Sequence, residues 1–255
     1  MRKLLFLLLC FNLITMGQVP VIQGHRGCRG LYPENTLPAF QHALTMGVTV
    51  LEMDVCLSAD GQVYVSHEPY LNPLYASFLD GNPVTVSTIN LYQKPYSEIK
   101  TFDVGSRGNK LFPEQVRIVT YKPLLSEVLA LGEAFSRKTG RKIFYNIEIK
   151  SESSEYGKSQ PATVKEFADR VWAVIAGQIS PDALILQSFD FAVLQYWKTA
   201  IHQVAEEVCA GDASVRYTSD KDLMFCDVKP LLRLAERAHQ LEAAMDIERR
   251  TEGQA

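Results

Sequence analysis

The residues of this sequence with the clearest capacity for chemistry are two histidines and three acids. His25 follows the apolar run Val19–Gln23, and His67 follows the apolar run Val63–Ser66. An imidazole takes or gives a proton near neutral pH. Two imidazoles on opposite sides of a phosphorus atom would therefore supply the general base and the general acid for a displacement at that atom.

The three acids have the pattern of a metal site. Glu52 and Asp54 are separated by one residue within the apolar segment Val48–Val55, so in a strand they share a face, about 6–7 Å apart. Glu148, near the end of the segment Lys142–Ile149, would join them. A solvated acidic face is the alternative, but the apolar neighbours disfavour it, and buried acids without partners are rare. Three carboxylates without a cysteine favour Mg²⁺, Ca²⁺ or Mn²⁺ over Zn²⁺.

Two cations accompany these groups. Arg26 offers a planar fork for phosphate oxygens, and Lys150 offers a point charge. Gly27 lets the backbone turn sharply behind them. A single histidine more often has a structural role, but bases, cations and metal ligands in one set indicate chemistry at a phosphate.

The surrounding segments alternate between strands and helices, which indicates an α/β fold with a parallel sheet, layered or closed as a barrel. The predicted strands are Val19–Gln23, Val48–Val55, Val63–Ser66, Lys142–Ile149 and Ala183–Gln187. The predicted helices are one between a cap at Asn35 or Thr36 and a stop at Gly47, then Leu124–Phe135, Ala162–Ile179 and Phe191–Ile201. The candidate residues fall at or just past the C-terminal ends of predicted parallel strands, the rim where barrels carry their chemistry.

A long segment over residues 68–119 interrupts this alternation. It is rich in Pro and Gly and too long for a plain connection, so we interpret it as an inserted subdomain or lid. Its aromatic residues would either contact the substrate or pack within the insertion; they are Tyr70, Tyr75, Phe78 and Phe102.

Composition and the first residues indicate an exported globular protein. The chain has 255 residues, 47% of them apolar, and its net charge of −3 argues against nucleic-acid binding. A basic start, the apolar run Leu4–Ile14 and small residues before Gln18 predict a signal peptide over residues 1–17, with a retained anchor as the alternative. We therefore expect a periplasmic or extracellular protein with no stable membrane span after cleavage.

Four cysteines lie beyond the predicted signal peptide: Cys28, Cys56, Cys209 and Cys226. None of their spacings is Cys-x-x-Cys, so a zinc site is not expected. An exported chain could oxidise them, and the sequence leaves open whether they pair or stay as thiols. It also leaves the oligomeric state open.

Five motifs together resemble the glycerophosphodiester phosphodiesterases of exported bacterial type: HRG at 25–27, PENTLPAF at 33–40, LEMDV at 51–55, DGQVYVSH at 60–67 and NIEIK at 146–150. The resemblance runs from about Val21 to Ile201 and keeps the order and spacing of the motifs. It implies a TIM-type (β/α) barrel over residues 18–201, with the insertion after the third strand. It also implies a divalent cation, Ca²⁺ or Mg²⁺, and hydrolysis of small-molecule glycerophosphodiesters to glycerol 3-phosphate and an alcohol.

The same resemblance implies a role for each candidate residue. Those roles are catalysis for His25 and His67, substrate binding for Arg26 and Lys150, metal binding for Glu52, Asp54 and Glu148, and a place beside the site for Glu34 and Asn35. One departure is Glu68, because the family usually has Asp after the second histidine. Either acid can accept a hydrogen bond, so we expect the change to be tolerated.

Residues 202–255 are a second departure from the family pattern. A closed barrel needs about three more strand–helix units after Gln187, but this segment offers only a weak strand near Val204–Cys209 and a charged helix near Pro230–Arg250. Truncation or a shifted reading frame explains this better than a genuine variant. We therefore expect a barrel that is incomplete at its C-terminal strands, marginally stable, and weakly active or inactive.

Two other functions fit the same residues. A phospholipase D-like phosphodiesterase would share the paired histidines and the acidic metal site, although the insertion and the NIEIK context favour the first interpretation. A non-catalytic remnant would bind metal or phosphate without turnover.

Overall fold

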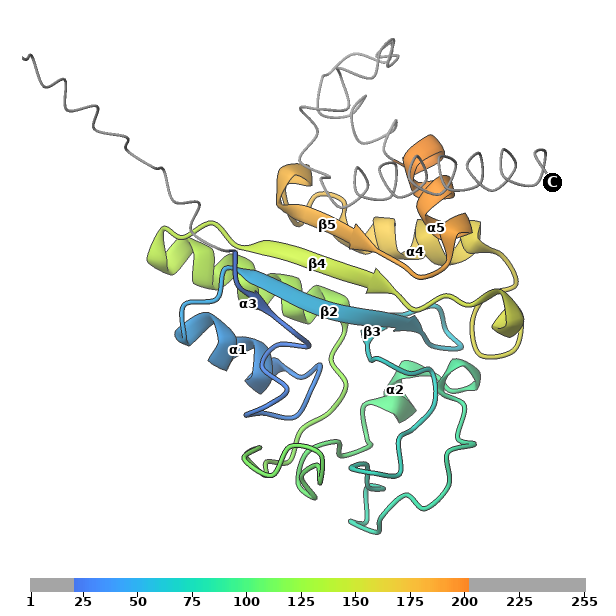
Figure 1. The fold of residues 1–255 in the computed structure, drawn as a ribbon. Helices are drawn as coiled ribbons and strands as arrows, with labels where there is room; N and C mark the ends of the chain where they lie inside the picture. Colours follow the sequence, from blue (N-terminus) through green and yellow to red (C-terminus); the bar gives the residue numbers. More distant parts are fainter. Residues whose placement is uncertain (1–20, 202–255) are drawn as a thin grey trace, which may run out of the picture.

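The computed structural model of the chain describes residues 21–201 (Figure 1). The predictions about the signal peptide, Cys209, Cys226 and the segment 202–255 lie outside the described residues. Among the described residues, no helix has the length and apolarity needed to cross a membrane. Within residues 21–201, Cys28 and Cys56 are free thiols and form no disulfide with each other.

Four parallel strands form the centre of the described region. They are β1 (Gln23–Gly24), β2 (Val50–Leu57), β4 (Phe144–Ile149) and β5 (Leu184–Gln187), in the spatial order β1-β2-β4-β5. Within residues 21–201 the parallel sheet thus has half of the eight strands of a closed barrel. The predicted α/β architecture is confirmed.

Helices follow these strands along the chain. The α-helices are α1 (Leu37–Thr45), α3 (Leu125–Thr139), α4 (Val164–Ile175) and α5 (Phe191–Tyr196), and a π-helical turn, η4 (Trp197–Ile201), continues α5. Short 3₁₀ turns, η2 (Ser153–Glu155) and η3 (Pro181–Ala183), lie in the connections. α1 ends before Gly47, whose φ of 98° is the left-handed conformation that the sequence predicted for a stop.

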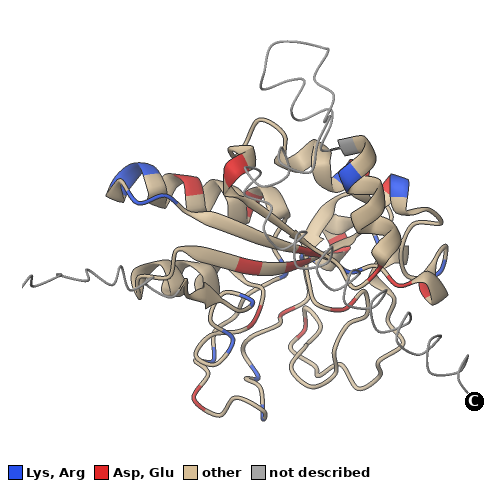
Figure 2. Cartoon of the chain, turned by 45° about the horizontal axis from the view of Figure 1, so that its top comes forward, with Lys and Arg blue, Asp and Glu red and all other residues tan. Residues whose placement is uncertain are grey.

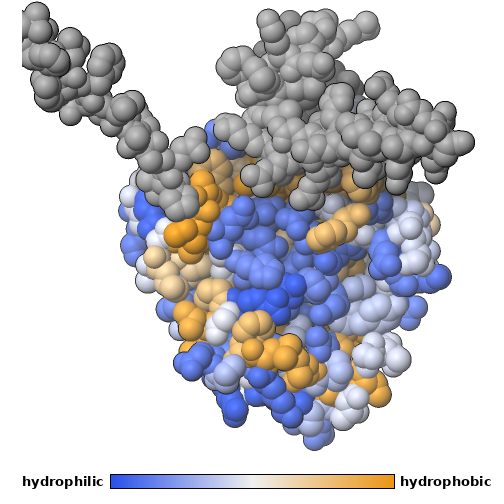
Figure 3. All heavy atoms as spheres, viewed as in Figure 1, coloured by the Kyte–Doolittle hydropathy of each residue, from blue (hydrophilic) through white to orange (hydrophobic). Residues whose placement is uncertain are grey.

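The two faces of the sheet differ in character because side chains alternate along each strand. One face packs under the helices as the main core and includes Leu51, Met53, Val55, Ile147 and Leu186. The opposite face carries polar side chains from three strands: Glu52, Asp54, Asn146, Glu148 and Gln187. Helix α3 lies behind the sheet in Figure 1, and hydrophilic residues occupy the middle of the front face in the same view (Figure 3).

Strand β3 (Val63–Val65) corrects one expectation, because it runs antiparallel to β2 rather than parallel to the other strands. The connection over residues 58–62 is too short for the crossover that a parallel neighbour needs. It is a tight hairpin in which Gly61 has a φ of 73°. His67 therefore follows an antiparallel strand.

The insertion over residues 68–119 packs as a subdomain against β2 and β3, in a small second core that also includes Cys56 and Tyr64 (teal to green in Figure 1). It contains a 3₁₀ turn, η1 (Leu91–Gln93), and a short helix, α2 (Tyr96–Ile99). Tyr75 and Phe102 are buried in this core. Of the two roles expected for these aromatic residues, the structure therefore shows packing rather than substrate contact. The insertion also contacts the segment after β1, because Gln115 Nε2 donates to the carbonyls of Arg29 and Tyr32 at 2.9 and 2.8 Å.

Candidate active site

Two strands stop on the same edge of β2, and this arrangement brings the histidines together. β1 pairs with β2 as far as Leu51, and β3 pairs with it from the opposite direction as far as Val55. His25 comes directly after β1, and His67 follows β3 after one residue. The two imidazoles therefore enter from opposite ends of the short β2 stretch that carries the acids.

A left-handed turn at Arg26 and Gly27 fixes the first of these acids. Arg26 has a φ of 52° and Gly27 a φ of 82°, and a Cβ on Gly27 would lie 2.8 Å from the backbone carbon of Ala39. Only glycine suits the second position. The turn points the Arg26 backbone N–H at Glu52, and this N–H donates to Oε2 at 2.6 Å.

The three predicted acids converge. One carboxylate oxygen each from Glu52, Asp54 and Glu148 lies within 4.8 Å of the others, and all three residues are buried. Acidic positions on neighbouring strands meet near the middle of the molecule in Figure 2. β2 runs on to Leu57, so Glu52 and Asp54 lie within their strand and not at its end, contrary to expectation.

Burial makes the ionised form of these acids unfavourable. Burial, and next the neighbouring Asp54, raise the pKa of Glu52 to about 7. Burial also raises the pKa of Glu148, against the opposing effect of Lys150. A divalent cation would offset this charge, and three buried carboxylate oxygens are suitable ligands for a hard ion. The donor set therefore fits Ca²⁺ or Mg²⁺.

Two cations already contact the acids. Lys150 Nζ donates to Glu148 Oε1 at 2.7 Å and lies 3.8 Å from Asp54 Oδ1. Arg26 Nη1 donates to Glu34 Oε1 at 2.8 Å, and Arg26 Nε lies 3.3 Å from Asp54 Oδ2. The Arg26 guanidinium thus organises carboxylates, while its Nη2 makes no protein hydrogen bond among residues 21–201.

The Pro-Glu-Asn-Thr step also supports the acids. Asn35, with a φ of 56°, donates from Nδ2 to Asp54 Oδ2 at 2.9 Å. Thr36 occupies the N-cap position of α1, but its hydroxyl donates to the carbonyl of Pro33 at 2.6 Å and does not cap the helix. Neither residue caps α1 with its side chain, because both side chains are engaged elsewhere.

Both histidines line a cavity of about 370 Å³ that also contains Glu52, Glu148 and Lys150. The His25 side chain is 56% exposed, and its Nε2 lies 4.0 Å from Glu52 Oε2. Burial, followed by the charges of Arg26 and Arg29, lowers the pKa of His25. His67 Nδ1 lies 3.3 Å from Glu68 Oε1, so Glu68 reaches the ring as expected and leaves Nε2 for a substrate.

Four further residues line this cavity that the sequence analysis did not select: Gln23, Asn146, Gln187 and Phe189. Signals for two of them were present. Asn146 precedes Glu148 by two residues on the same strand and so shares its face. Gln187 is the last residue of β5 and pairs in register with Glu148.

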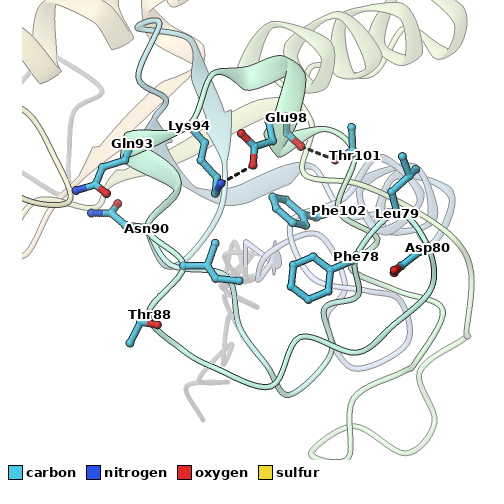
Figure 4. Close-up of a pocket in the computed structure, with 11 residues that line it drawn as sticks. Phe78, Leu79, Asp80, Thr88, Asn90, Gln93, Lys94, Glu98, Thr101 and Phe102 are labelled. Atoms are coloured by element: carbon cyan, nitrogen blue, oxygen red, sulfur yellow. Dashed lines mark hydrogen bonds and ion pairs between the residues drawn. The ribbon is translucent and has the colours of Figure 1, made fainter.

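A larger hollow, of about 820 Å³, lies on the insertion and differs in kind from the cavity. It is lined by Phe78, Leu79 and Phe102, with the ion pair of Lys94 and Glu98 at its wall (Figure 4). No histidine contributes to this lining. None of residues 68–119 lines the smaller cavity, so the insertion contributes no side chain to it, and its role as a lid stays a prediction.

Comparisons with known proteins point to one family. The model of the glycerophosphoryl diester phosphodiesterase family matches residues 25–242, and so continues beyond Ile201, where the resemblance was expected to stop. A glycerophosphodiester phosphodiesterase of Bacillus altitudinis is 37% identical over 137 residues, 53% of this chain and 47% of that protein. A lysophospholipase D of Mus musculus is 34% identical over 143 residues, 56% of this chain and 40% of its own.

Solved structures show the same likeness. A putative glycerophosphoryl diester phosphodiesterase of Silicibacter pomeroyi superposes with a TM-score of 0.64 at 29% identity, covering 72% of this chain and 62% of that one. An Oleispira antarctica phosphodiesterase in complex with sn-glycerol 3-phosphate has the same fold, with a TM-score of 0.53 at 24% identity over 71% of this chain and 62% of that one. The chain spans about half the length of the curated relatives named above.

Proposed function

Because the chain belongs to the glycerophosphoryl diester phosphodiesterase family, we propose that it hydrolyses glycerophosphodiesters to glycerol 3-phosphate and an alcohol. The observation that carries this proposal is the cavity of about 370 Å³, whose wall combines both histidines, Lys150 and two of the three clustered acids. This set contains proton carriers, a phosphate-binding cation and oxygen ligands for a metal, the groups that cleavage of a phosphodiester requires.

The two histidines move the protons of the reaction. One imidazole accepts a proton from the attacking oxygen, and the other donates a proton to the departing alkoxide, so that water is added across one P–O bond. Glu68 holds the His67 ring through Nδ1, which directs Nε2 to the substrate. Their entry from opposite ends of one β2 stretch suits a base and an acid on opposite sides of a phosphate.

The cations bind and orient the phosphate. Lys150 lines the cavity beside Glu148, where its ammonium can contact a phosphate oxygen. Arg26 lines the same cavity, and its guanidinium also contacts the carboxylates of Glu34 and Asp54. Glu52, Asp54 and Glu148 would hold Ca²⁺ or Mg²⁺, and a bound cation there supplies Lewis-acid stabilisation of charge on the phosphate.

A coupled assay for glycerol 3-phosphate tests this function. The purified protein should release glycerol 3-phosphate from glycerophosphocholine, and a chelator should abolish the release. Retained metal binding without any release would instead favour a non-catalytic phosphate- or metal-binding protein.

Lysophospholipase D activity is a second candidate, favoured by the similarity to the mouse protein of that name. Lysophosphatidylcholine and sphingomyelin in the same assay, with choline release as the readout, separate it from the first function. Faster choline release from lysophosphatidylcholine than from glycerophosphocholine would make it the better description.

A further inference from the structure

A buried lysine lies behind the turn that carries His67. Lys122 is only 4% exposed and does not line the cavity. It belongs to the segment that joins the insertion to α3, and this segment runs beside β3, where the Val65 N–H donates to the Pro123 carbonyl at 2.7 Å. The proposed proton transfers and phosphate contacts do not use Lys122. Because burying an ammonium group is costly, the polar groups around it must compensate for the burial.

A chain of hydrogen bonds connects Lys122 to the residues on both sides of His67. Lys122 Nζ donates to Ser66 Oγ at 2.7 Å, and Ser66 Oγ donates to the carbonyl oxygen of Glu68 at 2.7 Å. An ammonium group has donors only, so the Ser66 oxygen must accept from it. The single hydroxyl hydrogen of Ser66 is then left for the Glu68 carbonyl, which fixes the direction of the chain.

The turn that this chain braces is also anchored at its two ends. The Ser66 N–H donates to the Asp54 carbonyl at 2.9 Å, which attaches the start of the turn to β2. At the other end, Glu68 Oε1 lies 3.3 Å from His67 Nδ1 and accepts from Asn72 Nδ2 at 3.4 Å. The backbone on each side of His67 and the carboxylate beside its ring are therefore held together.

The charge of Lys122 acts on the same carboxylate. Burial lowers the pKa of Lys122, and Glu68 opposes this effect more than any other neighbouring group does. Although burial acts to raise it, the pKa of Glu68 is lowered overall by its hydrogen bond with His67 and by the charge of Lys122. The centroid of the Tyr75 ring lies 5.9 Å from Nζ, within the range of a cation–π interaction. These contacts favour an ionised Glu68, the form that accepts a hydrogen bond from Nδ1.

We propose that Lys122 is a positioning residue for His67, and that it acts through the Ser66 hydroxyl and through Glu68. Lys122 then sets the direction in which the imidazole presents Nε2, without contacting the substrate. This inference rests on the proposed function, in which His67 transfers a proton. Through Tyr75, it also connects the core of the insertion to the catalytic turn.

Steady-state kinetics of Lys122→Met tests the effect on turnover. Methionine removes the ammonium group and keeps an unbranched side chain of similar length. With saturating Ca²⁺, kcat for glycerophosphocholine should fall about 10- to 100-fold and KM should stay within about 3-fold, because a proton carrier that is slightly misplaced slows the chemical step. Lys100→Met is the matched control, since Lys100 also lies over a tyrosine ring, 5.1 Å from that of Tyr121, but is exposed. Its kcat should stay within about 2-fold.

The His67→Ala background separates positioning from a general loss of structure. If Lys122 acts only through His67, Lys122→Met should change the residual turnover of His67→Ala by less than about 2-fold. A distorted site would instead lower this residual turnover by the same factor as in the wild type.

Nitrogen-15 NMR of protein labelled at histidine gives a readout that does not depend on turnover. The chain has five histidines, and the signal lost in His67→Ala identifies His67. At alkaline pH the wild-type ring should carry its proton on Nδ1, facing Glu68. In Lys122→Met the two tautomers should become mixed. Ser66→Ala breaks the chain at its middle and should mix them too, so it decides the matter if Lys122→Met does not fold.

The outcomes separate this inference from the function on which it rests. A His67 tautomer that is unchanged in both Lys122→Met and Ser66→Ala overturns the inference. In an active wild type, an unchanged kcat in Lys122→Met or a loss that persists at full size in the His67→Ala background also overturns it. If the wild type releases no glycerol 3-phosphate but both variants mix the tautomers, the inference stands and only the proposed function is contradicted.

Discussion

The cavity at the sheet and the hollow on the insertion are built in opposite ways. The cavity, of about 370 Å³, has walls from strands in register and from the residues directly after them. The hollow, of about 820 Å³, has walls mostly from loops and short turns between Phe78 and Phe102. The smaller space carries both histidines and two of the clustered acids, and the larger carries neither histidine nor acid triad.

The difference shows that the placement of polar groups, rather than volume, marks the reactive site. At the cavity, each of the three clustered acids is held by another side chain or a backbone N–H, as Glu52 is by Arg26 and the adjacent Asp54 is by Asn35. Such groups are positioned before a substrate arrives. In the hollow the charged groups are Asp80 and the pair Lys94 and Glu98, and an exposed pair of this kind contributes little.

The largest expected effect is the loss of a histidine from the cavity. His25→Ala and His67→Ala should each lower kcat by about 10²- to 10⁴-fold, because each removes a proton carrier. His42→Ala is the control, since His42 stacks on Tyr32 with ring centroids 4.6 Å apart and does not line the cavity. Steady-state kinetics with a thermal melt of each variant provides the measurement, and near wild-type turnover in His25→Ala would remove this residue from the mechanism.

The second expected effect is on metal binding. Glu148→Gln should weaken Ca²⁺ affinity by about 100-fold or more, because one of three converging carboxylates loses its charge. Glu166→Gln, in the first turn of α4, is the matched control. Isothermal titration calorimetry measures both, and an unchanged affinity in Glu148→Gln would show that the acid cluster is not the metal site.

A third effect concerns stability and pH. The pKa of Glu52 rises from 4.5 to about 7 in the folded protein, so between these values the folded state holds more protons than the unfolded state. The free energy of unfolding of the metal-free protein should therefore fall as pH rises from 4.5 to 7, by on the order of 2 kcal/mol.

Urea denaturation at pH 5 and pH 8 measures this change. Saturating Ca²⁺ should reverse it, since the ion favours the ionised carboxylate, and Glu52→Gln should flatten the pH dependence of the metal-free protein. An equal slope in wild type and Glu52→Gln would contradict the assignment of this slope to Glu52.

The smallest effect is expected in the hollow on the insertion. Lys94→Met breaks the ion pair with Glu98, and kcat/KM should stay within about 2-fold, with a stability change below about 1 kcal/mol. A loss of activity comparable to that of His25→Ala would contradict the conclusion that only the cavity is reactive. It would show that the hollow is part of the substrate site.

Local patterns in the sequence were sufficient for much of this structure. The apolar segments predicted the four parallel strands to within a few residues, and the spacing of Glu52 and Asp54 predicted that they share a face. These features depend on side-chain alternation and on turn chemistry, which a short segment determines by itself. The connection before β3 is too short for a parallel crossover, so the sequence already indicated an antiparallel strand. The prediction of a parallel strand there was wrong.

Other features depend on which strands become neighbours. Hydrogen bonds link Gln23, Asn146 and Gln187 because of the register between strands far apart in the sequence. In this register Asn146 pairs with Ile185, and Glu148 pairs with Gln187. The pairing of Arg26 with Glu34 and Asp54 likewise requires the left-handed turn after β1 to pack against β2.

The sequence by itself determined the kinds of groups at this site, the strands that carry them and the family resemblance. Tertiary structure alone decided that the insertion shares a second core with β2 and β3, and that Asn146 is buried beside the acids and joined by hydrogen bonds to Gln23 and Gln187. The physical reason is that a hydrogen bond or a buried contact between distant segments has no local signature. It is set by register and packing, which form only when the whole sheet assembles.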